Sequence, residues 1–117
     1  MAVTGIAFTM YPVSDVPRAV AFYRDRLGLK QTEIDMPYWV EFDVDGATFG
    51  VGNFEQVGTP GSAQSLALEV GDLEALRADL IAHDVAVTEA FETPVCFISV
   101  VKDPDGNQIW LHQSKPR

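Results

Sequence analysis

Two stretches of the chain place apolar residues at helical spacing directly after an aspartate. After Asp15 the apolar positions are Val16, Ala19, Val20, Tyr23 and Leu27, and after Asp72 they are Leu73, Leu76 and Leu80. An aspartate is a favourable N-cap, because its carboxylate accepts hydrogen bonds from the free N–H groups of the first helical turn. We therefore predict one helix from near Asp15 to Leu27, ended by Gly28, and another from near Asp72 to His83.

The other apolar runs predict strands. Residues 5–13 and 65–70 each precede one of the predicted helices, and two hairpins follow, over residues 38–54 and 95–113. The first hairpin turns at Asp45-Gly46, and the second turns at Asp103-Pro104-Asp105-Gly106-Asn107. Both segments carry the residues that tight turns require.

The order of strand, helix and about three strands occurs twice, and the two N-cap aspartates lie 57 residues apart. We predict an α+β fold of two βαβββ modules in a single domain, residues 1–117. The first module covers about residues 4–56, a linker rich in Gly, Pro and Ser covers about 57–64, and the second module covers about 65–114. Each half is too small to bury a core alone. A generic α+β sandwich without internal symmetry is the alternative.

Composition narrows the choice of partners. Among the 117 residues, 47% are hydrophobic, which suits a packed core, and 8 basic against 17 acidic residues give a net charge of −9. Binding to nucleic acid or to an anionic membrane depends on cationic side chains, so we expect neither partner. The acidic charge instead attracts a cationic small molecule, although it also simply favours solubility.

Targeting features are absent from the sequence pattern. Cys96 is the only cysteine, so no disulfide forms within the chain. The first basic residue is Arg18, no apolar run follows a charged start, and no apolar stretch is long enough to span a bilayer. We expect a cytoplasmic protein.

The repeated pattern resembles the vicinal oxygen chelate superfamily, which includes glyoxalase I, extradiol dioxygenases and bleomycin resistance proteins. In the first half the matching residues are Val13-Ser14-Asp15, Ala21-Phe22-Tyr23-Arg24-Asp25 and Leu27-Gly28-Leu29. In the second half they are Leu66-Ala67-Leu68-Glu69-Val70, Asp72 and Asp103-Pro104-Asp105-Gly106-Asn107. The resemblance implies the glyoxalase/bleomycin-resistance fold, in which the modules form an open, cupped mixed sheet. It identifies a fold and not a reaction.

The resemblance also implies where a metal ion would bind. In metal-using members, the ligands stand seven residues before each N-cap aspartate and in the fourth strand of each half. Here those positions hold Phe8, Ser65, Gly50 and Trp110. A divalent ion needs several imidazole, carboxylate or thiolate donors, so we predict no metal site and no cofactor. Glyoxalase and dioxygenase chemistry, which depend on the ion, are disfavoured.

Hairpin register predicts which side chains share the cup. A two-residue Asp45-Gly46 turn places Glu41 opposite Gly50 and Trp39 opposite Gly52, so the two glycines leave space above the sheet. A three-residue loop over residues 104–106 places Val100 opposite Trp110 and Ile98 opposite His112. The candidate ligand-binding residues are Phe8, Trp39, Glu41, Gly50, Ser65, Cys96, Trp110 and His112.

Several of these residues have ordinary structural alternatives. Phe8 and Trp110 can fill the cup as a second core. His112 can be solvated, and Cys96 can be a small buried hydrophobe. Glu41 can bind a cation, act as a general base or lie at a wet rim.

We therefore predict a metal-free protein that binds an apolar or aromatic small molecule in the cup, with a cationic ligand as one option. The runner-up is a metal-independent lyase or isomerase that uses Glu41 and His112 as acid and base, and a third alternative is a glyoxalase-like or dioxygenase-like metal enzyme with relocated ligands. The sequence leaves open whether any reaction is catalysed. The resemblance further implies a homodimer, because dimeric relatives form the cup jointly.

Overall fold

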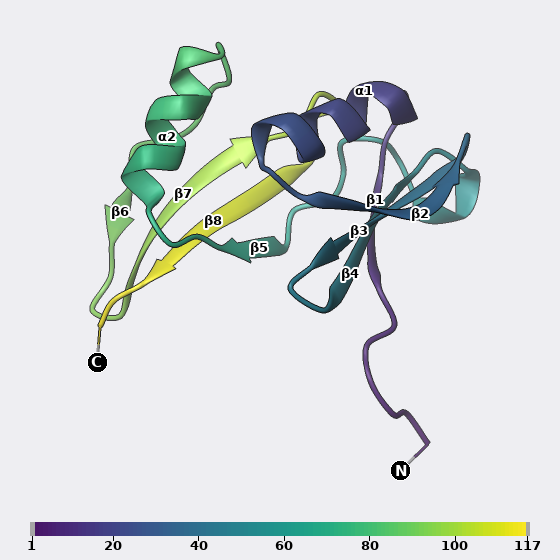
Figure 1. Cartoon of the computed structure of the whole chain (residues 1–117), viewed down its shortest axis with the longest axis horizontal. Coiled ribbons are helices and arrows are strands. Elements are labelled where there is room, and N and C mark those ends of the chain that lie inside the picture. The colour runs from purple at the N-terminus through teal and green to yellow at the C-terminus, as the bar shows by residue number, and fades with distance from the viewer. Residues whose placement is uncertain (1, 117) are drawn as a thin grey trace.

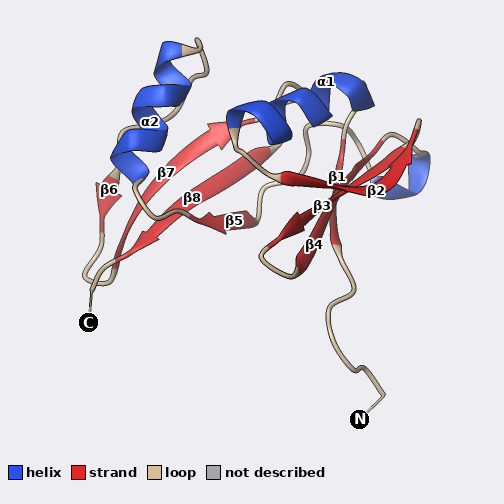
Figure 2. Cartoon of the chain, viewed as in Figure 1, coloured by secondary structure: helices blue, strands red, loops and turns tan. Residues whose placement is uncertain are grey.

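The computed structural model describes residues 2–116 as two four-stranded sheets, each with a helix against one face (Figures 1 and 2). The first sheet has the order β1-β4-β3-β2 and consists of β1 (Thr9–Pro12), β2 (Lys30–Met36), β3 (Trp39–Val44) and β4 (Ala47–Gly52). The second has the order β5-β8-β7-β6 and consists of β5 (Leu66–Glu69), β6 (Phe91–Glu92), β7 (Cys96–Lys102) and β8 (Gln108–Ser114). The predicted α+β fold of two βαβββ modules is confirmed.

The two helices begin where the sequence predicts. In α1 (Val16–Ala21) the Asp15 carboxylate accepts a hydrogen bond from the N–H of Arg18, and in α2 (Leu73–Ala82) Asp72 caps the first turn in the same way. His83 ends α2 as its C-cap. The first helix departs from the prediction in its last turn.

That last turn of the first helix is a π-helix, η1 (Phe22–Arg26), and not a continuation of the α-helix to Leu27. The backbone N–H of Leu27 donates to the carbonyl of Phe22, five residues earlier, which is the hydrogen-bond spacing of a π-helix. The wider turn buries both Phe22 and Tyr23, and Gly28 follows with a φ of +75°.

Strand register confirms the internal repeat. Strands β1 and β5 are 57 residues apart, like the two N-caps, and each pairs in parallel with the last strand of its own module. Glu41 lies opposite Gly50 and Trp39 opposite Gly52, across a turn in which both central residues have a positive φ. In the second hairpin, Val100 pairs with Trp110 and Ile98 with His112, as predicted. The modules are therefore aligned residue by residue.

The first strand is shorter than predicted. Only Thr9–Pro12 pairs with β4, although the apolar pattern predicts a strand over residues 5–13. Strand β4 starts at Ala47, so the earlier residues have almost no strand to pair with. Residues 2–8, called the N-terminal arm here, are exposed, with Ile6 91% accessible, and the arm runs away from the body toward the N-terminus (Figure 1).

One apolar core lies between the helices and the sheets and includes residues of both modules. Its largest fully buried side chains are Tyr23, Phe42, Leu73, Leu80, Ile109 and Leu111. Within residues 2–116, the opposite face of each sheet is not covered by an α-helix and is called the open face. The core thus packs against one face of each sheet, and the open face of each sheet is left outside the core.

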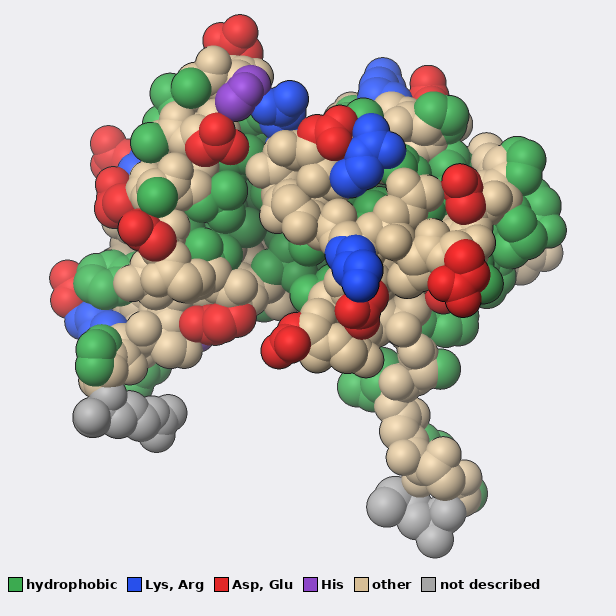
Figure 3. Space-filling view, in the orientation of Figure 1, with side chains coloured by type: hydrophobic (Ala, Val, Ile, Leu, Met, Phe, Trp, Pro, Cys, Tyr) green, Lys and Arg blue, Asp and Glu red, His purple; other side chains and the backbone are tan. Residues whose placement is uncertain are grey.

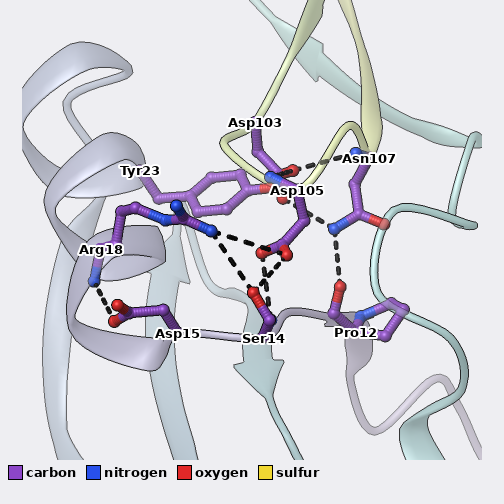
Figure 4. Close-up of polar contacts among 8 residues, drawn as sticks. All are labelled: Pro12, Ser14, Asp15, Arg18, Tyr23, Asp103, Asp105 and Asn107. Atoms are coloured by element: carbon purple, nitrogen blue, oxygen red, sulfur yellow. Dashed lines mark hydrogen bonds and ion pairs between the residues drawn. The ribbon is translucent and has the colours of Figure 1, made fainter.

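A polar clamp joins the modules at the tip of the second hairpin (Figure 4). The buried Asp103 carboxylate accepts hydrogen bonds from the Tyr23 hydroxyl (2.7 Å) and from the side-chain amide of Asn107 (2.8 Å). The same Asn107 amide donates to the carbonyl of Pro12 (2.7 Å), and Asp105 accepts from the Ser14 hydroxyl (2.6 Å). Burial and the Asp103 carboxylate raise the pKa of Tyr23, which stays neutral and donates.

The charged side chains are scattered over the surface in Figure 3. Asp and Glu spread over both halves, whereas Lys and Arg form no continuous patch on the face shown (Figure 3). None of the helices within residues 2–116 combines the length and apolar character needed to cross a bilayer.

Candidate functional site

The open face of the first sheet gathers three aromatic rings. Trp39 stacks on Phe54, with 5.4 Å between ring centroids and 18° between planes, and Phe8 meets Trp39 edge-on at 5.5 Å. The indole N–H of Trp39 donates to Glu41 (2.9 Å), which fixes the tilt of the ring. Because Trp39 and Glu41 are two residues apart on one strand, their side chains share this face.

These rings border a surface cavity, called the aromatic slot here, of about 360 Å³. Its lining residues come from the arm, from β1, from β3 and from the segment that leaves β4: Phe8, Met10, Trp39, Phe54, Gln56 and Val57. The last two belong to the short 3-10 helix η2 (Glu55–Val57). A slot with flat aromatic walls and few polar groups suits a planar organic molecule.

The space above the two glycines of β4 is occupied, contrary to the sequence expectation. A Cβ at Gly50 would lie 2.8 Å from the terminal methyl of Met10, and one at Gly52 would lie 2.9 Å from the Phe54 ring. The glycines therefore let Met10 and Phe54 lie against the strand. They shape the slot from beneath and do not themselves form an empty floor.

The open face of the second sheet is built differently. Trp110 is half-buried beside Val100, and its indole N–H donates to the carbonyl of Gln64 (2.9 Å). His112 follows on the same face, opposite Ile98. This face combines aliphatic side chains with one indole and one imidazole.

His112 has an acidic partner on the neighbouring strand. Its Nδ1 lies 2.6 Å from Oε1 of Glu69, and Oε2 of Glu69 accepts the backbone N–H of Ser114 (2.9 Å). These hydrogen bonds, with the one from Ser114 the larger cause, hold the pKa of Glu69 below its usual range. A carboxylate can only accept, so the proton between the two residues is on Nδ1 of His112.

Two further candidates lie apart from these groups. Ser65 is exposed directly before β5. Cys96 is buried, with its Sγ 3.0 Å from the hydroxyl of Thr93. Neither residue lines the aromatic slot.

The candidate residues fall into two groups, one on each sheet. Phe8, Trp39, Glu41 and Gly50 lie together on the first sheet, and Trp110 and His112 lie together on the second. The aromatic slot is lined only from the first module and the segment after it. Glu41 and His112, proposed from sequence as an acid–base pair, have separate partners, Trp39 and Glu69. Within one chain the geometry therefore gives no support to a mechanism in which both residues exchange protons with the same substrate.

The positions that hold metal ligands in relatives do not fit a metal ion here. Phe8, Gly50, Ser65 and Trp110 supply one hydroxyl among them. Across residues 2–116, no three His, Cys, Asp or Glu side chains are grouped so as to hold an ion. No step of a reaction is therefore derived through a metal.

Sequence reasoning missed two contributors. Phe54 forms a wall of the slot, and its signal was its position two residues beyond Gly52, which keeps it on the same face. Glu69 was missed because its pairing with His112 needs the parallel β5–β8 register, which no local pattern reveals.

The fold and site place the chain in a known family. Residues 5–111 match the model of the Glyoxalase/Bleomycin resistance protein/Dioxygenase superfamily. The chain belongs to this superfamily, the vicinal oxygen chelate superfamily identified from the sequence motifs. No curated protein matches the chain.

Several solved structures resemble it. An antibiotic binding protein from Streptomyces sp. CB03234, TnmS3, is 30% identical, with a TM-score of 0.87 over 98% of this chain and 99% of that one. A glyoxalase/bleomycin resistance protein from the same organism is 30% identical, with a TM-score of 0.82 over 93% and 100%. A lactoylglutathione lyase from Agrobacterium tumefaciens is 17% identical, with a TM-score of 0.78 over 97% and 96%, and shares the fold.

Proposed function

We propose that this protein binds a planar aromatic small molecule without a metal ion, with the ligand held against the aromatic slot. The observation that carries the proposal is the slot itself, in which Trp39, Phe54 and Phe8 border a cavity open to the surface. Stacking on indole and phenyl faces recognises flat ligands with little demand on their polar groups. Sequestration of such a ligand requires no catalytic residue.

Two independent facts support a binding role. The 30% identical TnmS3 is described as an antibiotic binding protein and matches nearly end to end. The net charge of −9 favours encounter with cationic ligands over anionic ones. An aromatic ligand with a positive charge would use both the charge and the rings.

We further propose that the protein works as a homodimer in which each slot is closed by a second copy. The slot receives no side chain from the open face of the second sheet. Strands β1 and β5 are both at sheet edges, and the apolar side chains of the arm are exposed, including Val3 at 69% and Phe8 at 43%. Unpaired edges and apolar arms of this kind are normally covered by another chain.

Binding is tested by isothermal titration calorimetry with proflavine, a planar cation, and 7-methoxycoumarin, a planar neutral molecule. Cyclohexylamine, a cation without a flat ring, serves as the comparison compound. We expect both planar compounds to bind, proflavine more tightly, and cyclohexylamine to show no heat above dilution. Absence of binding by both planar compounds at millimolar concentration would contradict the proposal.

A variant pair assigns the binding to the slot. Trp39→Ala removes a stacking wall, and we expect an affinity loss of about thirtyfold, which is the usual effect of losing a large aromatic contact. Phe91→Ala removes an exposed aromatic ring of β6, outside the slot, and should change nothing. Equal losses in both variants would place the ligand elsewhere.

The dimer is tested by light scattering on the full chain and on a variant that lacks residues 2–7. We expect a mass near twice 12.8 kDa for the full chain and near one chain mass for the shortened form. A full chain that stays at one chain mass at micromolar concentration would contradict the proposal.

A further inference from the structure

The His112–Glu69 pair lies on the open face of the second sheet and does not line the slot of its own chain. In the proposed homodimer, where a second copy closes each slot, the pair can reach a ligand held in the other chain's slot. The two residues are direct partners across the parallel strands β5 and β8, and their side chains are 2.6 Å apart. Glu69 is held at both oxygens, by His112 and by the N–H of Ser114. The carboxylate therefore fixes the imidazole in one orientation and one tautomer.

This arrangement leaves the second ring nitrogen free. Among residues 2–116, Nε2 of His112 has no hydrogen-bond partner, and the side chain keeps 32% of its surface accessible. Because Nδ1 carries the proton that points to Glu69, Nε2 of the neutral ring presents a lone pair. In the protonated ring the same atom is a donor. Either way, the free nitrogen lies on the side of the ring away from the carboxylate.

The surroundings of His112 are apolar on the open face. Trp110 stands two residues earlier on β8, and Ile98 lies directly opposite on β7. Glu69 is the charged side chain that contacts the ring. A polar nitrogen beside an indole matches a ligand whose hydroxyl group is attached to an aromatic ring.

We propose that, in the homodimer, His112 of one copy, positioned by Glu69, uses Nε2 to recognise an acidic aromatic hydroxyl of the ligand held in the slot of the other copy. The ligand O–H donates to the neutral imidazole, and if the proton moves, it passes from the ligand oxygen to Nε2 and the imidazolium then donates to the phenolate. The same proton forms the hydrogen bond between the ligand oxygen and Nε2 whether it resides on the oxygen or on the nitrogen. An ether oxygen at the same place has no proton to donate to the neutral ring. This inference rests on the proposed function and names the polar group that the ligand carries.

The test compares two planar probes that differ only in this group, 7-hydroxycoumarin and 7-methoxycoumarin. Affinities are measured at pH 7 by isothermal titration calorimetry. For the unmodified protein we expect the hydroxyl probe to bind about tenfold more tightly, the usual gain from one hydrogen bond to a site built to accept it. In His112→Phe, which keeps a ring but has no acceptor, we expect the two probes to bind equally.

Control variants separate recognition from general damage. His83→Asn changes the other histidine, which is the C-cap of α2 and lies outside the site, and should keep the tenfold preference. Glu69→Gln tests the positioning role, and we expect the preference to fall to about threefold. In the same variant, the imidazole ¹⁵N shifts of His112 should change from a single tautomer to a mixture, which a purely structural role of Glu69 would not produce.

The outcomes are distinct. If both probes bind with equal affinity to the unmodified protein, the role of His112 is refuted while the proposed function stands. If neither coumarin binds but proflavine does, the role of His112 is refuted while the proposed function stands; if proflavine fails to bind as well, the proposed function fails and the role of His112 fails with it. If the hydroxyl preference persists in His112→Phe, another residue supplies it and the assignment is wrong.

Discussion

The open faces of the two sheets carry their large ring side chains on different strands: the third strand in the first module and the fourth strand in the second. In the first module the fourth strand contributes Gly50 and Gly52, and the large ring, Trp39, comes from the strand beside it. At the equivalent positions of the second module the fourth strand contributes Trp110 and His112, and the strand beside it contributes aliphatic residues. The register that relates these positions is the same in both halves.

The helix-facing sides behave in the opposite way. Both modules bury branched or aromatic residues there, such as Phe42 and Val51 in the first and Ile109 and Leu111 in the second. The repeat therefore keeps the helix-facing side of each sheet apolar and varies the residues on the open side. The first open face carries stacked aromatic rings, and the second carries an imidazole paired with a carboxylate.

The largest effect is expected where the halves are joined. Asp103→Ala removes four hydrogen bonds and leaves the Tyr23 hydroxyl buried without its acceptor. We expect a loss of about 3 kcal/mol in unfolding free energy, measured by urea denaturation. Asp43→Ala, at the other hairpin, removes one exposed hydrogen bond and should cost less than about 1 kcal/mol. Similar losses of unfolding free energy in the two variants would show that the buried clamp stabilises the fold no more than an exposed turn hydrogen bond does.

Trp110→Ala separates binding from folding on the second open face. The indole is only partly buried, so we expect about 1 kcal/mol of lost stability but about thirtyfold weaker binding of 7-hydroxycoumarin. Urea denaturation and titration calorimetry on one preparation give both quantities. A loss of 3–5 kcal/mol, the usual cost of deleting a core aromatic residue, would instead identify Trp110 as core filler.

Gly50→Ala probes the packed floor of the first open face. The added Cβ meets Met10 at 2.8 Å and the Val40 carbonyl at 3.2 Å, so we expect a cost of about 1 kcal/mol. In a Met10→Ala background, where the side chain is shortened, the same substitution should cost less than half as much. Additive losses in the double variant would contradict the contact between these two residues.

Ser99 places an unsatisfied buried hydroxyl in the second module at a position where the first module has an apolar side chain. Its register equivalent is Val40, and its hydroxyl is fully buried with no hydrogen-bond partner among the described residues. Ser99→Ala removes this unsatisfied group, and we expect a gain of about 1 kcal/mol in stability. A thermal melt of the variant should shift upward; a downward shift would show that the hydroxyl is satisfied in solution.

The smallest expected effect is the pH dependence of stability that comes from Glu69. Because the pKa of Glu69 is lowered in the folded protein, the Glu69 hydrogen bonds stabilise the fold at neutral pH, and this contribution is lost as the pH falls below about 4. The stability difference between the unmodified protein and Glu69→Gln should therefore be largest at pH 7 and shrink in acid. The carboxylate is mostly exposed, so screening keeps the difference small. A difference that stays constant from pH 7 to pH 3 would contradict the pairing.

Local chemistry explains why most of the fold was predictable. Asp15 and Asp72 cap helices because a side-chain carboxylate satisfies nearby N–H groups, and Asp45-Gly46 sets the register of a hairpin by its own turn geometry. These effects act within a few residues, so the sequence displays them. The π-turn after Ala21 and the short first strand depended on packing and on the length of β4, which no local pattern encodes.

The site was less predictable for a related reason. Strand parity correctly placed Trp39 with Glu41 and Trp110 with His112, because directly opposed residues share a face. Parity does not say how side chains fill the space above a glycine, so Met10 and Phe54 were not assigned to it. Nor does it show that Glu69, 43 residues away, holds His112.

The clamp also has a consequence for the order in which the chain can fold. Its hydrogen bonds between the two modules link residues 80 to 95 positions apart, such as Tyr23 with Asp103 and Pro12 with Asn107. During synthesis the first module leaves the ribosome long before its partner hairpin exists, so the Tyr23 hydroxyl must wait in contact with water. Closing so large a loop costs conformational entropy and is slow, and the hydrogen bonds that offset this cost form only after the last hairpin has folded. The two halves should therefore reach the native state together, in a late and cooperative step.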